Sequence, residues 1–406
     1  MKAYERLLEY VVIKTPSCEA NASSTPSSSC QFDLAYVLAD EMKELGLSDV
    51  YVSDKCYVYG KLPATSGYEN IACIGFIAHM DTVEEFTEAA IHPVLHENYD
   101  GNDVILGESG RVIDVKTFPH LPDLKGRTLI TTDGNTVLGA DDKAGIAEIL
   151  TMIEELIHND IPHGPIAVAF TPDEEIGSGA EDLDLARFGA KYAYTLDGDT
   201  EGEIQFENFN ACSATFDITG LSVHPGDSKD KMINASLVAM EINGMLPGAE
   251  IPRNTEMYEG FYHLTDMKGD CGKAELHYIV RDHDASRFAS RKETLKHIEK
   301  IMNEKWGAGT VKLTLKDQYK NMSEIIQDGN MHLIDHAKKA CELAGIVPIV
   351  SPIRGGTDGC QLSYRGLPCP NLGTGGHGFH GPYEHITVEG MDLVVKMLVE
   401  LVKLNM

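Results

Sequence analysis

Basic residues are scarce in this chain of 406 residues, in which 34 Lys and Arg stand against 63 Asp and Glu. The formal net charge of −29 gives a surface that repels the phosphates of nucleic acids and the head groups of anionic lipids. We therefore expect neither a nucleic-acid partner nor a membrane partner. The same excess leaves many carboxylates free to bind cations.

Long apolar runs are also missing. No stretch approaches the roughly 20 apolar residues that cross a bilayer. Residues 1–15, MKAYERLLEYVVIKT, carry charges where a secretory signal would have an uninterrupted apolar core. The nine cysteines form no CxxC pair and are scattered from Cys18 to Cys369. An odd, scattered set is typical of reduced thiols, so we expect a cytoplasmic protein rather than a disulfide-linked one.

Up to about residue 205, apolar strands alternate with helices. The strand at 71–79 is followed by an insert that reads as loop-rich, and then by a helix at 141–159 whose apolar residues keep a 3.6-residue rhythm. Two further apolar strands follow, in 164–175 and 191–199. This order predicts an α/β fold with a mostly parallel central sheet covered on both faces.

The pattern then changes. Three segments alternate like half-exposed antiparallel strands: 203–220, 274–284 and 310–319. Helices are expected around 231–245 and 284–304, and after residue 325 the α/β pattern resumes. We therefore expect an α/β domain made of residues 1–208 and 322–406, interrupted by a smaller, lid-like α+β domain made of residues 209–321.

Ionisable side chains follow the apolar strands of the α/β part. They are His79 and Asp81, Asp141 and Asp142, Asp173, Glu174 and Glu175, and Asp197 and Asp199, with His377, His380 and His385 in a late segment. In open α/β sheets ligands bind outside the carboxyl ends of the strands, so these groups are expected to converge. Imidazoles and carboxylates gathered in one place require a cation, and this mixture suits zinc, or cobalt and manganese as substitutes.

Each signal alone has a plainer interpretation. The His79–Asp81 pair could cap a loop, and Asp141 and Asp142 could simply begin a helix, where Asp is favoured. Glu174 and Glu175 could lie in a solvated loop, and His377 and His385 read as loop residues. The coincidence of these groups at consecutive strand ends favours the metal site. About five ligands exceed the three that hold a single catalytic zinc, which predicts two ions sharing one carboxylate.

The motifs HMDT, GADDKAG, TPDEEIG, LDGD and HGPYE, in this order, resemble those of the dinuclear zinc exopeptidases related to carboxypeptidase G, succinyl-diaminopimelate desuccinylase and tripeptide aminopeptidase. The longer segments SVHPGDSKDKMINA, IPRNTEMYEGFYHL and PIRGGTDG favour the tripeptide aminopeptidase branch. The resemblance covers nearly the whole chain. It departs at HGPYEH, where a HGKHE-like stretch is usual, which puts the nearby loop contacts in question.

The resemblance implies a role for each matching residue. One zinc would be held by His79, Asp141 and Asp197, and the other by Asp141, Glu175 and His380. Asp141 would bridge the two ions, with a cis peptide bond to Asp142. Asp81 would orient His79, as carboxylates commonly do for metal-bound imidazoles, and Glu174 would be the general base.

In the lid-like domain the resemblance assigns His224 to the oxyanion of the tetrahedral intermediate. Without the resemblance His224 reads as a turn residue before Pro-Gly. Arg281 could form a buried ion pair or contact the substrate, and Arg354 could anchor a peptide carboxylate.

The function implied is a metal-dependent aminopeptidase that releases the first residue of short peptides with a free N-terminus, above all tripeptides. A homodimer is compatible with the resemblance. The alternatives are a dizinc amidase of the same family (an N-deacylase, desuccinylase or dipeptidase) and, more remotely, a noncatalytic peptide-binding protein.

Overall fold

The computed structural model describes residues 1–406 and divides them into two compact units. The larger unit contains Met1–Phe206, Met322–Ser351 and Thr357–Met406. The smaller unit contains Glu207–Asn321 and Pro352–Gly356. None of the helices combines the length and the apolar composition needed to cross a bilayer.

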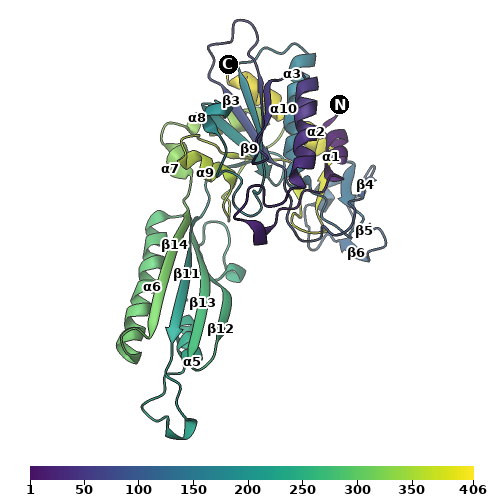
Figure 1. Cartoon of the computed structure of the whole chain (residues 1–406). Coiled ribbons are helices and arrows are strands. Elements are labelled where there is room, and N and C mark those ends of the chain that lie inside the picture. The colour runs from purple at the N-terminus through teal and green to yellow at the C-terminus, as the bar shows by residue number, and fades with distance from the viewer. The chain divides into compact units, whose positions relative to one another are not determined.

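An eight-stranded sheet forms the centre of the larger unit (Figure 1). Its strands, in spatial order, are β1 (Ser48–Val52), β2 (Val58–Leu62), β8 (Ile166–Thr171), β3 (Ile74–His79), β9 (Tyr192–Gly198), β16 (Asn371–Gly373), β10 (Glu203–Gln205) and β15 (Ile349–Val350). The pairs around β3 and β9 are parallel, whereas β1, β2 and β10 bring antiparallel pairs. The predicted α/β class with a mostly parallel sheet is confirmed.

Helices cover both faces of this sheet. They are α1 (Ala3–Val11), α2 (Gln31–Glu44), α3 (Ala140–His158), α4 (Leu185–Phe188), α7 (Ser323–Gln327), α8 (Met331–Ala344), α9 (Asp358–Tyr364) and α10 (Val388–Leu404). Successive side chains of a strand point to opposite faces. Accordingly, Phe76 and Ala78 of β3 pack in the core shared with α1, α3 and α10, while Ile77 packs with Phe188 and Leu362 on the other side.

The segment after β3 is more regular than the sequence indicated, because it contributes strands to a second sheet. This antiparallel sheet has the order β17 (Gly376–His377), β18 (His385–Thr387), β7 (Leu129–Thr132) and β4 (Pro93–His96). A hairpin of β5 (Val104–Leu106) and β6 (Arg111–Ile113) lies beside its own small core. The short η1 (Glu19–Asn21) and η2 (Leu121–Leu124) are 3-10 helices. His377 and His385, interpreted as loop residues, therefore lie in strands.

The smaller unit is an antiparallel sheet with two helices (Figure 1). The sheet has the order β12 (Phe261–Gly269), β13 (Lys273–Asp282), β11 (Asn210–Thr219) and β14 (Val311–Tyr319). Helices α5 (Ala235–Gly244) and α6 (Ala285–Trp306) share its apolar core, and η3 (Pro225–Asp227) and η4 (Pro252–Asn254) lie in the connections. The alternating segment 203–220, expected as one strand, is divided between β10 of the larger unit and β11 of the smaller one.

Candidate metal centre

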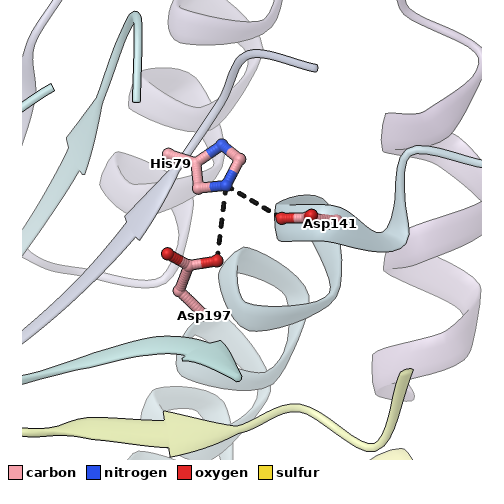
Figure 2. A group of neighbouring side chains, drawn as sticks. All are labelled: His79, Asp141 and Asp197. Atoms are coloured by element: carbon pink, nitrogen blue, oxygen red, sulfur yellow. Dashed lines mark hydrogen bonds and ion pairs between the residues drawn. The ribbon is translucent and has the colours of Figure 1, made fainter. Parts of the chain in front are cut away.

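His79 ends the buried strand β3, and its ring is held in one orientation. The Nδ1 N–H donates to the backbone carbonyl of Asp81 at 3.0 Å, so Nε2 points away from the strand. Nε2 lies 2.9 Å from Oδ1 of Asp141 and 3.5 Å from Oδ1 of Asp197 (Figure 2). Burial alone would lower the pKa of His79, but the neighbouring carboxylates of Asp197 and Asp141 raise it well above its ordinary value.

Asp141 lies between two groups of side chains. It stands near the start of α3, after Gly139 in the left-handed conformation with φ 78°, and its own backbone is not helical. The peptide bond between Asp141 and Asp142 is cis, as the resemblance implied. While Oδ1 faces His79, Oδ2 lies 3.1 Å from Nε2 of His380. One carboxylate thus presents an oxygen to each group.

The second group is completed by Glu175, whose Oε2 lies 3.1 Å from Nε2 of His380. The ligand atoms of His79, Asp141 and Asp197 all lie within 4.8 Å of one another, and so do those of Asp141, Glu175 and His380. Burial raises the pKa of Glu175 to about 7, whereas the imidazoles lower that of Asp141 despite its burial. Several carboxylates compressed in this way are stabilised by a cation, and both donor sets have the chemistry of a zinc site.

Glu174 belongs to neither donor set. Burial raises its pKa well above the ordinary value, and the nearby carboxylate of Asp197 raises it further. Its backbone N–H donates to Oδ1 of Asp81 at 3.0 Å, and that of Glu175 donates to Oδ2 of Asp81 at 3.1 Å. The Asp81 carboxylate, which is fully buried, therefore fixes the backbone of both glutamates.

The role expected for Asp81 was to orient His79. Its carboxylate oxygen lies 3.4 Å from Nδ1 of His79, farther than its backbone carbonyl. The carboxylate of Asp142 accepts the backbone N–H of His79 at 3.0 Å instead. Asp199 lies in neither donor set, and its backbone N–H donates to Glu203.

Two further carboxylates support the centre: Glu384, to which the sequence assigned no role, and Asp173, which the sequence placed among the strand-end groups without a role of its own. Glu384 is 1% exposed and accepts backbone N–H groups of Leu138 and Gly139, both at 2.7 Å, and of Asp141 at 2.9 Å. Asp173 has a positive φ of 57° and accepts the backbone N–H of Ser27 at 2.7 Å. Glu384 stands four residues after His380, and this spacing was the only sequence signal for it.

The three remaining candidates lie in the smaller unit. His224 is exposed, and its Nδ1 accepts the backbone N–H of Gly226 at 3.1 Å. Arg281 is buried, donates to the carbonyls of Cys212 and Val280, and places its guanidinium over the ring of Tyr319, with no ion pair to a carboxylate.

Arg354 donates from Nη1 to the carbonyls of Met257 at 2.8 Å and Glu259 at 3.0 Å, and its guanidinium lies over the ring of Phe209. Each of these three side chains is thus engaged within its own unit.

Comparison with known proteins places the chain among peptidases. Residues 132–404 match the model of the peptidase family M20/M25/M40. Peptidase T of Clostridium perfringens (strain ATCC 13124) is 51% identical over 404 residues, covering 99% of this chain and 98% of that protein. The crystal structure of aminopeptidase PepT from Bacillus cereus superposes with a TM-score of 0.79 at 24% identity, over 100% of this chain and 98% of that one. A tripeptidase from Staphylococcus aureus gives 0.78 at 20% identity, over 100% and 98%.

Proposed function

The chain belongs to the peptidase family M20/M25/M40, and from this premise we propose that it is a metal-dependent aminopeptidase that releases the first residue of short peptides, above all tripeptides. The family resemblance in the motifs is confirmed, and the relative at half identity over the full length is a peptidase T. The observation that carries the mechanism is the carboxylate of Asp141, with one oxygen toward each donor set.

Two divalent ions, for which zinc suits this mixture of imidazole and carboxylate, would supply Lewis-acid polarisation of the scissile carbonyl and lower the pKa of the attacking water. His79, Asp141 and Asp197 would hold one ion, and Asp141, Glu175 and His380 the other. The native metal is left to measurement, because the donor set also accepts cobalt and manganese.

Glu174 takes the proton from the attacking water on its carboxylate and returns it to the leaving amine. Its backbone is held by Asp81, which keeps the carboxylate beside the donor sets without making it a ligand. Its environment raises the pKa of Glu174, and a raised pKa favours a base that must also give the proton back.

The smaller unit is proposed as a lid that contributes His224, Arg281 and Arg354 to peptide binding, and as the surface of a homodimer. These roles are predictions from the sequence. So are the domain limits at residues 208/209 and 321/322 and the cytoplasmic location. An arginine suits bidentate binding of a peptide carboxylate.

The test is Glu174→Gln in the zinc-loaded protein. Zinc content should stay at the wild-type level, while turnover of a free tripeptide falls by roughly 100-fold or more, within the range lost with a general base. Glu181→Gln, an exposed residue seven positions on, is the matched control and should keep full activity. Turnover retained by Glu174→Gln would remove Glu174 as the base. Deacylation of an N-acetylated tripeptide by the wild-type protein would favour the amidase alternative.

A further inference from the structure

Three histidines form a cluster outside both donor sets. His377 and His385 are directly paired on β17 and β18, and His120 reaches them from the loop before η2. The ring centroid of His120 lies 4.0 Å from that of His377 and 5.1 Å from that of His385. Phe118 packs edge-on against His385, closing one side of the cluster.

The hydrogen bonds of the cluster fix the protons of two rings. The Nδ1 N–H of His385 donates to the backbone carbonyl of Tyr383 at 2.7 Å, because a carbonyl oxygen can only accept. Nε2 of the neutral His385 ring therefore carries a lone pair. Nε2 of His120 lies 2.9 Å away and donates its N–H to that lone pair. A backbone carbonyl that accepts one ring N–H and so leaves a lone pair on the other ring nitrogen is an arrangement common among metal-binding histidines.

The cluster is neutral near pH 7. Burial lowers the pKa of His385 to about 4, and burial lowers that of His120 and, most of all, that of His377. Arg127 lowers the pKa of His377 further, and Asp123 opposes the shift of His120. Neutral imidazoles can approach one another without charge repulsion, and each keeps one lone pair for a cation.

We propose that His120, His385 and His377 form an auxiliary site for a divalent transition metal of the zinc, nickel and copper class, separate from the proposed catalytic ions. These ions favour imidazole ligands. Two nitrogens on one tetrahedral zinc are about 3.3 Å apart, given zinc–nitrogen bonds of about 2.0–2.1 Å. The Nε2 atoms of His120 and His385 now lie 2.9 Å apart in rings that are nearly parallel. Binding requires them to separate slightly and both rings to turn until their lone pairs meet at the ion.

When the ion binds, it takes the place of the proton that lies between Nε2 of His120 and Nε2 of His385. The proton on Nε2 of His120 moves to Nδ1 of the same ring, so both rings stay neutral and no net proton is released. His120 is only partly buried, and water can accept the new N–H. His377 is stacked on His120 and tilted against His385, so its ring would have to turn away from the stack to offer the ion a third nitrogen.

The experiment is a zinc titration of the metal-stripped full chain, with bound zinc counted after equilibrium dialysis. His120→Asn should bind one equivalent less than the wild-type protein, while its tripeptide turnover stays unchanged. A circular dichroism spectrum like that of the wild-type protein would show that the variant is folded, although its melting temperature in chelator should fall because Nε2 of His385 loses a donor. His332→Asn is the matched control, because His332 and His336 form another close imidazole pair, with centroids 5.8 Å apart. It should bind as much zinc as the wild-type protein.

Equal zinc content in His120→Asn and the wild-type protein would overturn the proposal, as would a loss seen in His332→Asn instead. Both variants retain every residue of the proposed catalytic centre. The difference in zinc content between the two variants therefore does not depend on how many catalytic ions bind. If the proposed peptidase function were wrong, this difference would still report on the histidine cluster alone.

Discussion

The carboxylate of Glu384 accepts the backbone N–H of Asp141 at 2.9 Å, across 243 positions of sequence. Glu384 also follows His380 by four residues, so one short segment supplies a candidate ligand and holds the residue that faces both donor sets. The position of Asp141 is thereby tied to that of His380.

We predict that Glu384→Gln weakens metal binding. The amide keeps one acceptor oxygen but turns N–H donors toward backbone N–H groups, and hydrogen bonds to a charged group contribute about 1.5–3 kcal/mol. Zinc affinity and tripeptide turnover should each fall by roughly 10- to 100-fold. Glu389→Gln is the control, because Glu389 accepts a single N–H, from Thr128 at 2.8 Å, away from the donor sets. A wild-type zinc affinity in Glu384→Gln would rule out this positioning role.

The metal-free protein should become less stable as the pH rises from about 4.5 through about 7. Burial raises the pKa of Glu384 and of Glu175 to about 7 in the folded chain, above the ordinary value of 4.5. The folded state then binds more protons than the unfolded state in this window, so the free energy of unfolding falls with rising pH. His380, with a pKa raised to about 11, continues the same trend above its ordinary value of 6.5.

Thermal melting across this pH range, with chelator and with zinc, measures the effect. Zinc should oppose this loss of stability, because the side chains that bind the metal must be deprotonated, and metal binding therefore strengthens as the pH rises. A melting temperature that rises with pH in chelator would contradict the prediction.

Ser27→Ala should destabilise the larger unit by about 1–3 kcal/mol, the range for lost hydrogen bonds to a charged group or from a stranded buried donor. Asp173 would keep the donors Gln31 Nε2 and the backbone N–H of residue 27, whereas the backbone N–H of Cys18 would lose the Ser27 hydroxyl as its acceptor. The Ser27 hydroxyl donates to Asp173 at 2.6 Å, and both residues are buried. Urea unfolding of the metal-free protein measures the change, with Ser29→Ala, at an exposed position, as the control. If the two variants unfold at the same urea concentration, the bond to Asp173 contributes little to stability.

The sequence predicted the α/β class and the branch of the family because both depend on patterns that are local. The apolar rhythm of α3 and the apolar runs that became β3, β8 and β9 record burial directly. The acidic motifs could be located because Asp81, Glu174 and Asp197 lie at or just after the ends of these strands, and Asp141 lies at the start of α3. The roles of the residues they contain stay predictions until metal binding and turnover are measured.

The supporting contacts could not be predicted in the same way. A buried carboxylate such as Glu384 has partners on a distant segment, and periodicity records burial without identifying the partner. The cluster of His120, His377 and His385 was missed for the same reason, since two of its members lie more than 250 positions from the third. The alternating pattern of 203–220 also gave no sign that this segment contributes to two different sheets, because β10 and β11 are both partly buried strands.

The chain passes between the two units four times, after Phe206, Asn321, Ser351 and Gly356. The smaller unit is therefore not a cassette that can be excised at a single pair of junctions. A deletion of Glu207–Asn321 would leave behind Pro352–Gly356, and Arg354 would lose the carbonyls of Met257 and Glu259 that it now binds. A transplant of this unit between relatives has to carry both segments together.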